Sequence, residues 1–176
     1  MELVTSRLTL REFQDSDYVS FRELEAHPET FRFESTRPDE AFTRNYLKSA
    51  QADEAQIPRT RYRFAVTLPP ADEARGRVTL ALMNDSIQEW EIGWAVHPAE
   101  WGKGIATEAA RCLMEFAFVQ LHAHRVVAFS HAQNVASLRV MEKLGMQKDG
   151  HLRETRRWQG GWADEVVFSI LEREWR

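Results

Sequence analysis

A glycine-rich turn near the middle of the chain has the residue types that bind phosphate. It reads Trp101-Gly102-Lys103-Gly104-Ile105-Ala106-Thr107 and lies between an expected strand and an expected helix. Glycines let the backbone approach a ligand closely, and the first N–H groups of a helix have no acceptor within it. The helix dipole and the ammonium of Lys103 add positive potential. The turn is therefore a candidate anion site, with a tight turn shaped only by steric needs as the alternative.

The best-known phosphate motifs do not fit this turn. Gly104 is followed by Ile105 and Ala106 rather than by the Lys-Ser/Thr of a P-loop. The third glycine of a dinucleotide fingerprint would fall near Thr107. The rest of the chain must therefore decide what the turn binds.

Two carboxylates precede the turn on an alternating segment. Because strand side chains alternate between faces, Glu89 and Glu91 share a face with Gly93 and Ala95. Either carboxylate is a candidate proton acceptor, and a solvated strand residue is the alternative for both.

Expected strands and helices position these residues, in the order strand, two helices, an antiparallel meander and then a strand-helix-strand unit. We expect strands where polar and apolar residues alternate, and helices where apolar residues recur every three or four positions. The expected strands are 3–13, 61–68, 75–83, 87–97, 125–131, 146–157 and 163–171. The expected helices are 15–27, 39–52 with Phe42, Tyr46 and Leu47 on its inner face, 103–121, and 134–144 followed by Gly145 as its C′ residue. The unit over 87–131 is a βαβ crossover, so its two strands should be parallel neighbours.

Composition restricts the class of protein. The 176 residues fit one domain, and the net charge of −4 with a pI near 5.9 argues against a nucleic-acid binder. A mild acidic excess would instead favour a cationic acceptor. No apolar run approaches the ~20 residues of a bilayer span. The N-terminus lacks the features of a secretory signal, and the lone Cys112 excludes an intrachain disulfide, so we expect a cytoplasmic protein.

The turn resembles the acetyl-CoA signature of the GNAT superfamily, Q/R-x-x-G-x-G/A. Gly104 and Ala106 fill its two small positions, and Trp101 stands where Gln or Arg is usual. With Glu91-Ile92-Gly93-Trp94 upstream, the segment is similar to the RimJ/RimL-type ribosomal-protein N-acetyltransferases. Residues 134–137 and 141–146 resemble the second cofactor motif of that branch, residues 3–11 its opening strand and residues 161–175 its closing hairpin. The resemblance covers nearly the whole chain in order.

The resemblance implies an α/β (α+β) GNAT fold as a single N-acetyltransferase domain over residues 1–176. The implied sheet is mixed, mostly antiparallel and seven-stranded, with a central parallel βαβ unit, flanking helices and a V-shaped opening between 91–97 and 125–131. The implied cofactor is acetyl-CoA (coenzyme A). Its pantetheine would pair with the backbone of Ala95, Val96 and His97, and its pyrophosphate would lie on the N–H groups of residues 102 to 107. The implied mechanism is direct attack of a neutral amine on the thioester.

The resemblance also suggests the catalytic residues. Glu91 is the leading general base, because the superfamily often places a carboxylate there, and Glu89 is the fallback. The tyrosine that many members use to protonate the leaving thiolate is missing, since Tyr62 is the last tyrosine of the chain. The branch suggests Ser137 in its place, with an ordinary first-turn helix residue as the alternative.

Four further residue types have alternative roles. Asn134 is either a simple helix N-cap or a pantetheine ligand, and we favour cofactor contact. Lys143 is a candidate for a CoA phosphate, with a surface lysine as the equal alternative. Cys112 is expected to fill the core, and the six histidines show no metal-ligand spacing, so no metal site is expected.

Three functions fit these observations. The first is an N-acetyltransferase of protein N-terminal α-amines, of the ribosomal-protein type. An α-amine of pKa ~7.8 needs only about 1.1 kcal/mol to lose its proton at pH 7, against about 4.6 kcal/mol for a lysine of pKa ~10.4. The second function is acetylation of a small amine such as an aminoglycoside or polyamine, and the third is a non-catalytic acyl-CoA-binding module. The expected partner is the amine acceptor, with no stable nucleic acid and no membrane. A homodimer is compatible with the sequence.

Overall fold

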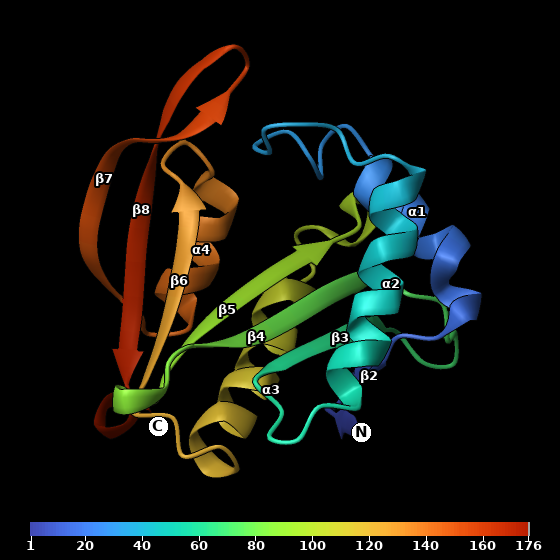
Figure 1. Cartoon of the computed structure of the whole chain (residues 1–176), viewed down its shortest axis with the longest axis horizontal. Helices are drawn as coiled ribbons and strands as arrows, with labels where there is room; N and C mark the ends of the chain where they lie inside the picture. Colours follow the sequence, from blue (N-terminus) through green and yellow to red (C-terminus); the bar gives the residue numbers. More distant parts are fainter. Residues whose placement is uncertain (176) are drawn as a thin grey trace.

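Strands β5 (Glu89–Val96) and β6 (Arg125–His131) are parallel neighbours near the centre of the sheet. The computed structural model describes residues 1–175, and within them eight strands pair in the order β1-β2-β3-β4-β5-β6-β8-β7. The other pairings are antiparallel. The βαβ crossover predicted over residues 87–131 is therefore confirmed (Figure 1).

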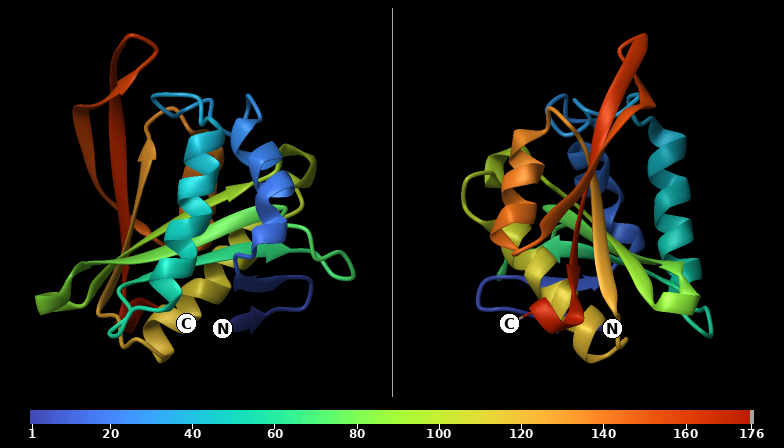
Figure 2. Two further views of the ribbon diagram at one scale, coloured as in Figure 1. Left: turned by 45° about the vertical axis from the view of Figure 1, so that its right-hand side comes forward. Right: turned by 90° about the vertical axis from the view of Figure 1, so that its left-hand side faces the viewer.

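Helices cover both faces of this sheet. The remaining strands are β1 (Glu2–Val4), β2 (Thr9–Glu12), β3 (Arg61–Thr67), β4 (Gly76–Asn84), β7 (Gln147–Trp158) and β8 (Gly161–Leu171). The helices are α1 (Tyr18–Ala26), α2 (Glu40–Glu54), α3 (Ile105–Val119) and α4 (Val135–Lys143). Helices α1 and α2 lie on one face and α3 and α4 on the other (Figure 2).

The ladder between β5 and β6 is short. It consists of three residue pairs: Glu89–Arg125, Trp90–Val126 and Glu91–Val127. Beyond them β5 stays paired with β4 as far as Val96, and β6 stays paired with β8 as far as His131. The two strands therefore diverge, and the predicted opening between them is confirmed (Figure 1).

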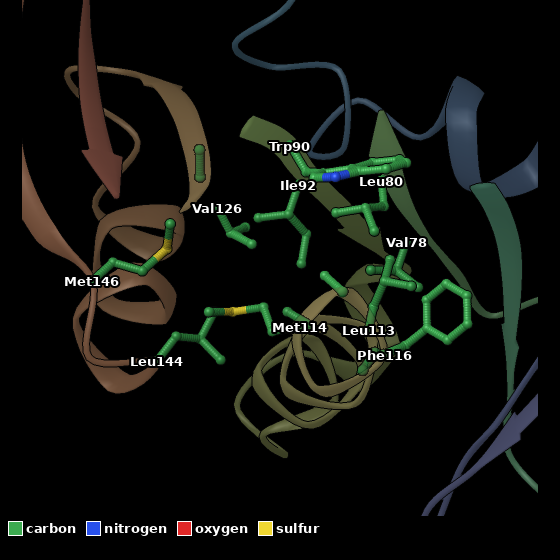
Figure 3. Packing of buried hydrophobic residues seen from close by; sticks show 14 of the residues in the cluster. Val78, Leu80, Trp90, Ile92, Leu113, Met114, Phe116, Val126, Leu144 and Met146 are labelled. Carbon is green, nitrogen blue, oxygen red and sulfur yellow. The ribbon is translucent and has the colours of Figure 1, made fainter. Parts of the chain in front are cut away.

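The main core lies between the sheet and helices α3 and α4. Val78 and Ile92 of the sheet pack against Leu113 and Met114 of α3, and all four are at most 1% exposed (Figure 3). Each side chain of this kind contributes roughly 1.5–3 kcal/mol when it is fully buried. Because side chains alternate along a strand, Glu91 faces the opposite side of the sheet from Ile92.

A second apolar cluster holds α1 and α2 against that opposite face. Phe21 of α1 and Leu47 of α2 pack with Ala65 of β3. The prediction that Tyr46 and Leu47 lie on the inner face of α2 is confirmed. Phe42 is a correction, because it is 40% exposed while its neighbour in the chain, Thr43, is buried.

The expected strand over residues 3–13 is two strands. The chain reverses between them, where the N–H of Thr5 donates to the carbonyl oxygen of Leu8 at 2.9 Å. The N–H of Leu8 donates in turn to Thr5 Oγ1 at 2.9 Å, so a hydroxyl stabilises the reversal that glycine or proline usually marks. The sheet consequently has eight strands rather than the seven expected.

Helix ends agree closely with the sequence signals. Gly145 follows α4 with φ of +79°, and the N–H of Met146 donates to the carbonyl oxygen of Met141 at 3.1 Å, which confirms the predicted C′ glycine. Helix α3 starts at Ile105 rather than Lys103, because Gly104 is left-handed at its N-cap. None of the helices in residues 1–175 has the length and apolarity that a bilayer crossing requires.

Candidate active site

Two left-handed glycines shape the turn between β5 and α3. Gly102 has φ of +76° and Gly104 has φ of +80°, values that L-residues with a Cβ rarely adopt. A Cβ on Gly102 would meet no atom within 4 Å. The requirement for glycine at this position is therefore conformational and does not arise from crowding.

This backbone path leaves donors at the start of α3. The first helical hydrogen bond runs from the N–H of Glu108 to the carbonyl oxygen of Gly104 at 3.0 Å. The N–H groups of Ile105, Ala106 and Thr107 precede it and have no acceptor within the helix. The positive end of the helix dipole lies at the same place. Several converging donors beside two permissive glycines fit the pyrophosphate of coenzyme A.

Charged side chains support the turn from both sides. Lys103 Nζ lies 2.9 Å from Glu100 Oε2. Arg7 donates from Nη1 to the carbonyl oxygen of Lys103 at 3.0 Å and forms an ion pair with Glu108. Although burial opposes ionisation, hydrogen bonds from Thr5 and Arg7 hold the pKa of Glu108 below its usual range. The β1–β2 hairpin therefore anchors the cofactor turn, a role that the sequence did not reveal.

Fewer backbone groups of β5 face the opening than the sequence predicts. Backbone hydrogen bonds alternate between the two neighbours of a strand. The N–H of His97 donates to the carbonyl oxygen of Arg75 at 2.8 Å, so His97 and Ala95 direct their backbone groups to β4. Val96 directs its groups to the opening, and its carbonyl oxygen accepts from Trp101 Nε1 at 2.7 Å. Of the three residues expected to pair with pantetheine, Val96 is therefore the one whose backbone groups face the opening, and the pairing itself stays a prediction.

Glu91 lies at the apex of the opening, on the last pair of the β5–β6 ladder. It is half-buried on the face that α1 and α2 cover. Burial raises the pKa of Glu91 above its ordinary value, Arg61 opposes that shift, and Glu165 adds to it. Glu91 is therefore a stronger proton acceptor than a solvated carboxylate.

Glu89, the fallback base, is engaged elsewhere. Arg125 contacts Glu89 through Nη1 and Asp149 through Nη2. The carboxylate of Glu89 is thus occupied by an ion pair with β6, whereas no side chain pairs with Glu91 in the described residues. The geometry therefore favours Glu91 over Glu89 as the base.

Three predicted site residues belong to α4 or its N-cap. Asn134 is the N-cap, and its Oδ1 accepts from the N–H of Ser137 at 3.2 Å. This uses the oxygen of the amide and leaves its NH₂ group for a ligand. Ser137 is half-buried in the first turn of α4, the helix that follows β6. Asn134 and Ser137 therefore lie at the end of α4 that follows β6, and Lys143 is exposed in the last turn at the other end.

The connection between α1 and α2 is fastened to the β7–β8 hairpin. Ser35 Oγ donates to the carbonyl oxygen of Arg157 at 2.8 Å, and Trp158 Nε1 donates to that of Arg32 at 3.0 Å. Arg156 adds an ion pair with Glu34 at 3.0 Å. The connection extends from α1 and α2 toward the β7–β8 hairpin (Figure 1). We refer to the region bordered by these two segments as the acceptor side of the opening.

An aromatic cluster lies beneath this fastening. The ring of His131 lies 5.0 Å from that of Phe33 and 4.6 Å from that of Trp158. The sequence alone does not select His131, because no local pattern connects residues as far apart as Phe33, His131 and Trp158. Its only signal was proximity to Asn134.

The single cysteine, Cys112, lies in the middle of α3. Cys112 packs against the main core, and burial raises the pKa of its thiol. Within residues 1–175 no three His, Cys, Asp or Glu side chains gather closely enough to hold a metal ion.

Comparison with known proteins identifies the family. Residues 7–147 match the family described as "Acetyltransferase (GNAT) domain", which is more than half of the chain. The chain therefore belongs to the GNAT acetyltransferases, enzymes that use acetyl-CoA to acetylate amines.

Individual relatives agree with this family. The "Uncharacterized N-acetyltransferase YnaD" of Bacillus subtilis (strain 168) is 29% identical over 99% of both chains. The spermidine N(1)-acetyltransferase of Escherichia coli (strain K12) is 24% identical, over 94% of this chain and 87% of the relative.

Solved structures share the fold. An acetyltransferase (GNAT family) from Bacillus anthracis superposes with a TM-score of 0.85 at 27% identity, covering 99% of this chain and 100% of that one. A ribosomal-protein-S5-alanine acetyltransferase from Vibrio fischeri gives 0.83 at 20% identity, covering 100% and 99%. A spermidine N-acetyltransferase from Vibrio cholerae, in complex with CoA and spermine, gives 0.81 at 22% identity, covering 97% and 98%. At these last two identities the likeness concerns the fold alone.

Proposed function

We propose that this protein transfers the acetyl group of acetyl-CoA to a protein N-terminal α-amine. The observation that carries this choice is that carboxylates at the acceptor side are already paired with basic side chains of the protein. Glu34 and Glu165 pair with Arg156 at 3.0 and 3.3 Å, and His151 Nε2 lies 2.6 Å from an oxygen of Asp164. A polyamine carries several positive charges and would need free carboxylates there.

The arginines of the same region support that choice. Arg37 and Arg157 form no ion pair within residues 1–175 and instead lie over the rings of Phe31 and Trp162, at 5.7 and 3.8 Å. Unpaired cations repel a polyamine but tolerate a peptide, which carries one positive charge at its reacting end. The single base at the apex also suits an α-amine, whose deprotonation costs about 1.1 kcal/mol at pH 7.

In the proposed mechanism the residues of this chain bind the cofactor and move protons. The donors at Gly102 to Thr107 and the backbone of Val96 hold the cofactor, which supplies a thioester open to attack by an amine. Glu91 removes a proton from the acceptor ammonium, so that a neutral nitrogen forms the new C–N bond. With acetyl-CoA bound, the hydroxyl of Ser137 would hydrogen-bond its sulfur and pass it the second proton that the nitrogen loses, so that CoA would leave as the thiol. The NH₂ group of Asn134 would orient the cofactor.

A mixed-acceptor assay tests the proposal. The protein is incubated with acetyl-CoA, peptides with free α-amines and spermidine, and thiol release and product mass are followed together. We expect peptide α-amines to be acetylated with kcat/KM at least about tenfold above that for spermidine. N-terminally blocked peptides that contain lysine serve as the control and should stay unmodified.

The second candidate is acetylation of a small amine, which the sequence likeness to a spermidine acetyltransferase favours. Acetylation of spermidine without any peptide product would establish it in place of our proposal. Binding of CoA without turnover of any amine would instead favour the non-catalytic module. The cytoplasmic location stays a prediction that cell fractionation would check. The homodimer stays a prediction that sedimentation of the purified protein would check.

A further inference from the structure

His131 carries a buried hydrogen-bond donor without a partner. It ends β6, at the wall of the opening, and is 3% exposed. Its Nδ1 accepts from the N–H of Gln133 at 3.1 Å, so the neutral ring carries its proton on Nε2. Nε2 is buried and makes no hydrogen bond with any of residues 1–175. A buried donor without an acceptor is uncommon in proteins and points to a ligand group.

The strand register places this donor at a fixed interval from the base. Glu91 pairs with Val127 on β6, and His131 lies four residues further along the same strand. Because side chains alternate, Val127 and His131 share the face that carries Glu91. Four residues at about 3.3 Å each separate the two levels by roughly 13 Å. His131 is therefore far from the reacting amine but within the length of a short extended peptide.

The surroundings of His131 keep it neutral. Burial, followed by the nearby charge of Arg156, lowers the pKa of His131, and the carboxylates of Glu165, Asp164 and Glu34 only partly oppose that shift. Phe33 on one side belongs to the connection between α1 and α2, and Trp158 on the other ends β7. The free group is thus a neutral N–H in an aromatic environment, which suits a carbonyl oxygen better than a charged partner.

We propose that His131 is a specificity-determining residue whose Nε2–H donates to a main-chain carbonyl oxygen of the second or third residue of a peptide acceptor. An extended chain advances at most about 3.6 Å per residue, which places those carbonyls on the order of 10 Å from the amine. The Phe33 ring, 5.0 Å from that of His131, would have to move aside to admit the acceptor. This inference rests on the proposed α-amine function and names the part of the acceptor that is recognised beyond the amine.

Two substitutions at the same position separate the donor from the rest of the ring. In His131→Asn the amide oxygen takes the place of Nδ1 and keeps an acceptor for the N–H of Gln133, but the distal donor is lost. In His131→Gln the amide reaches further and restores an N–H near the position of Nε2. His124→Asn is the matched control, because that histidine is exposed between α3 and β6.

Peptide length provides the decisive measurement. We compare amides of one to five residues that begin with the same amino acid. Loss of one neutral hydrogen bond should raise KM for the longer peptides about fivefold to tenfold in His131→Asn, with kcat little changed. One-residue amides and spermidine should be unaffected, His131→Gln should recover most of the loss, and His124→Asn should match the wild type.

A second readout does not depend on turnover. Calorimetry of a four-residue peptide amide with the protein alone should show the same weakening for His131→Asn, while CoA binding and melting temperature stay near wild type. Nitrogen NMR of the imidazole should report a neutral Nε2–H ring that shifts when the peptide is added. Peptides that are acetylated equally well at every length by all variants would overturn the role of His131 alone. Failure to acetylate any peptide would instead overturn the proposed function on which it rests.

Discussion

The indole Nε1 of Trp101 donates to the carbonyl oxygen of Val96 at 2.7 Å. Trp101 occupies the position where the acetyl-CoA signature usually has Gln or Arg, and its donor faces back toward β5 rather than toward a ligand. This contact ties the first residue of the cofactor turn to the strand that borders the opening. The departure from the signature thus has a structural role in fixing the start of the turn.

Trp101→Phe should weaken the binding of coenzyme A without unfolding the protein. The change removes a single hydrogen bond, worth about 0.5–1.5 kcal/mol, and lets the turn move relative to β5. We expect the Kd for CoA, measured by calorimetry, to rise about twofold to tenfold. Trp162→Phe is the control, since Trp162 is 54% exposed on the β7–β8 hairpin. An unchanged Kd in Trp101→Phe would show that the contact is incidental.

Gly102→Ala should destabilise the protein through its dihedral angle. The added Cβ meets nothing within 4 Å, but φ of +76° costs an L-residue roughly 1–2 kcal/mol. The melting temperature should therefore fall by about 2–8 °C. Gly161→Ala is the matched control, because Gly161 has no positive φ and its nearest neighbour lies at 3.8 Å. Equal melting temperatures for the two variants would contradict this account of the turn.

Glu91→Gln should lower kcat about 10²-fold or more, because the amide cannot accept the proton of the acceptor. In the wild type the acid limb of the kcat/KM profile should report the pKa of Glu91, above the ordinary value of 4.5. Glu89→Gln should keep both the rate and the acid limb, since Glu89 is paired with Arg125. Near-wild-type turnover in Glu91→Gln would remove this residue from the mechanism.

Stability should change in the opposite direction to activity at this position. The folded-state pKa of Glu91 is raised, so the folded protein binds more protons than the unfolded chain between the two values. The stability contribution is therefore lost as pH rises through this interval, and the cost of the buried carboxylate is complete at pH 7. Glu91→Gln should melt above the wild type at pH 7, with the difference disappearing toward about pH 4. A constant difference across this range would contradict the shift.

Glu108→Gln should have the reverse pH dependence. The pKa of Glu108 is lowered in the folded protein, so its contribution is present above the unfolded value and is lost as pH falls through the folded one. Because Arg7 is half exposed, we expect a loss of only roughly 0.5–1 kcal/mol at pH 7 in thermal unfolding. Glu142→Gln, on the exposed side of α4, should show no such dependence.

Local signals account for what the sequence predicted well. The turn at Gly102–Thr107, the crossover around it and the C′ glycine at Gly145 each depend on residues that are neighbours in the chain. The first strand was predicted too long, because Leu8 and Leu10 continue an alternation through a reversal made by the hydroxyl of Thr5. Phe42 was placed inside because its spacing is helical, although the buried stripe of α2 passes through Thr43 instead.

The acceptor side of the site could not be predicted in this way. Its walls depend on contacts between residues more than a hundred positions apart, such as Ser35 with Arg157. Which of Glu89 and Glu91 is free also depended on a distant partner, because Arg125 approaches only one of them from β6. Sequence periodicity gives the face on which a residue lies but not the group that meets it there.

The three-rung ladder between β5 and β6 has a mechanical consequence. Strands β1 to β5 form one part of the sheet and strands β6 to β8 the other. Within the sheet, the three residue pairs between β5 and β6 join the two parts. Hydrogen exchange of backbone amides should therefore be slow within each part and faster at Trp94 and Val96, near the end of β5 that does not pair with β6. A ligand that contacts both β5 and β6 along the opening would restrict the motion of the two parts relative to each other. Protection of these two amides from hydrogen exchange should then rise.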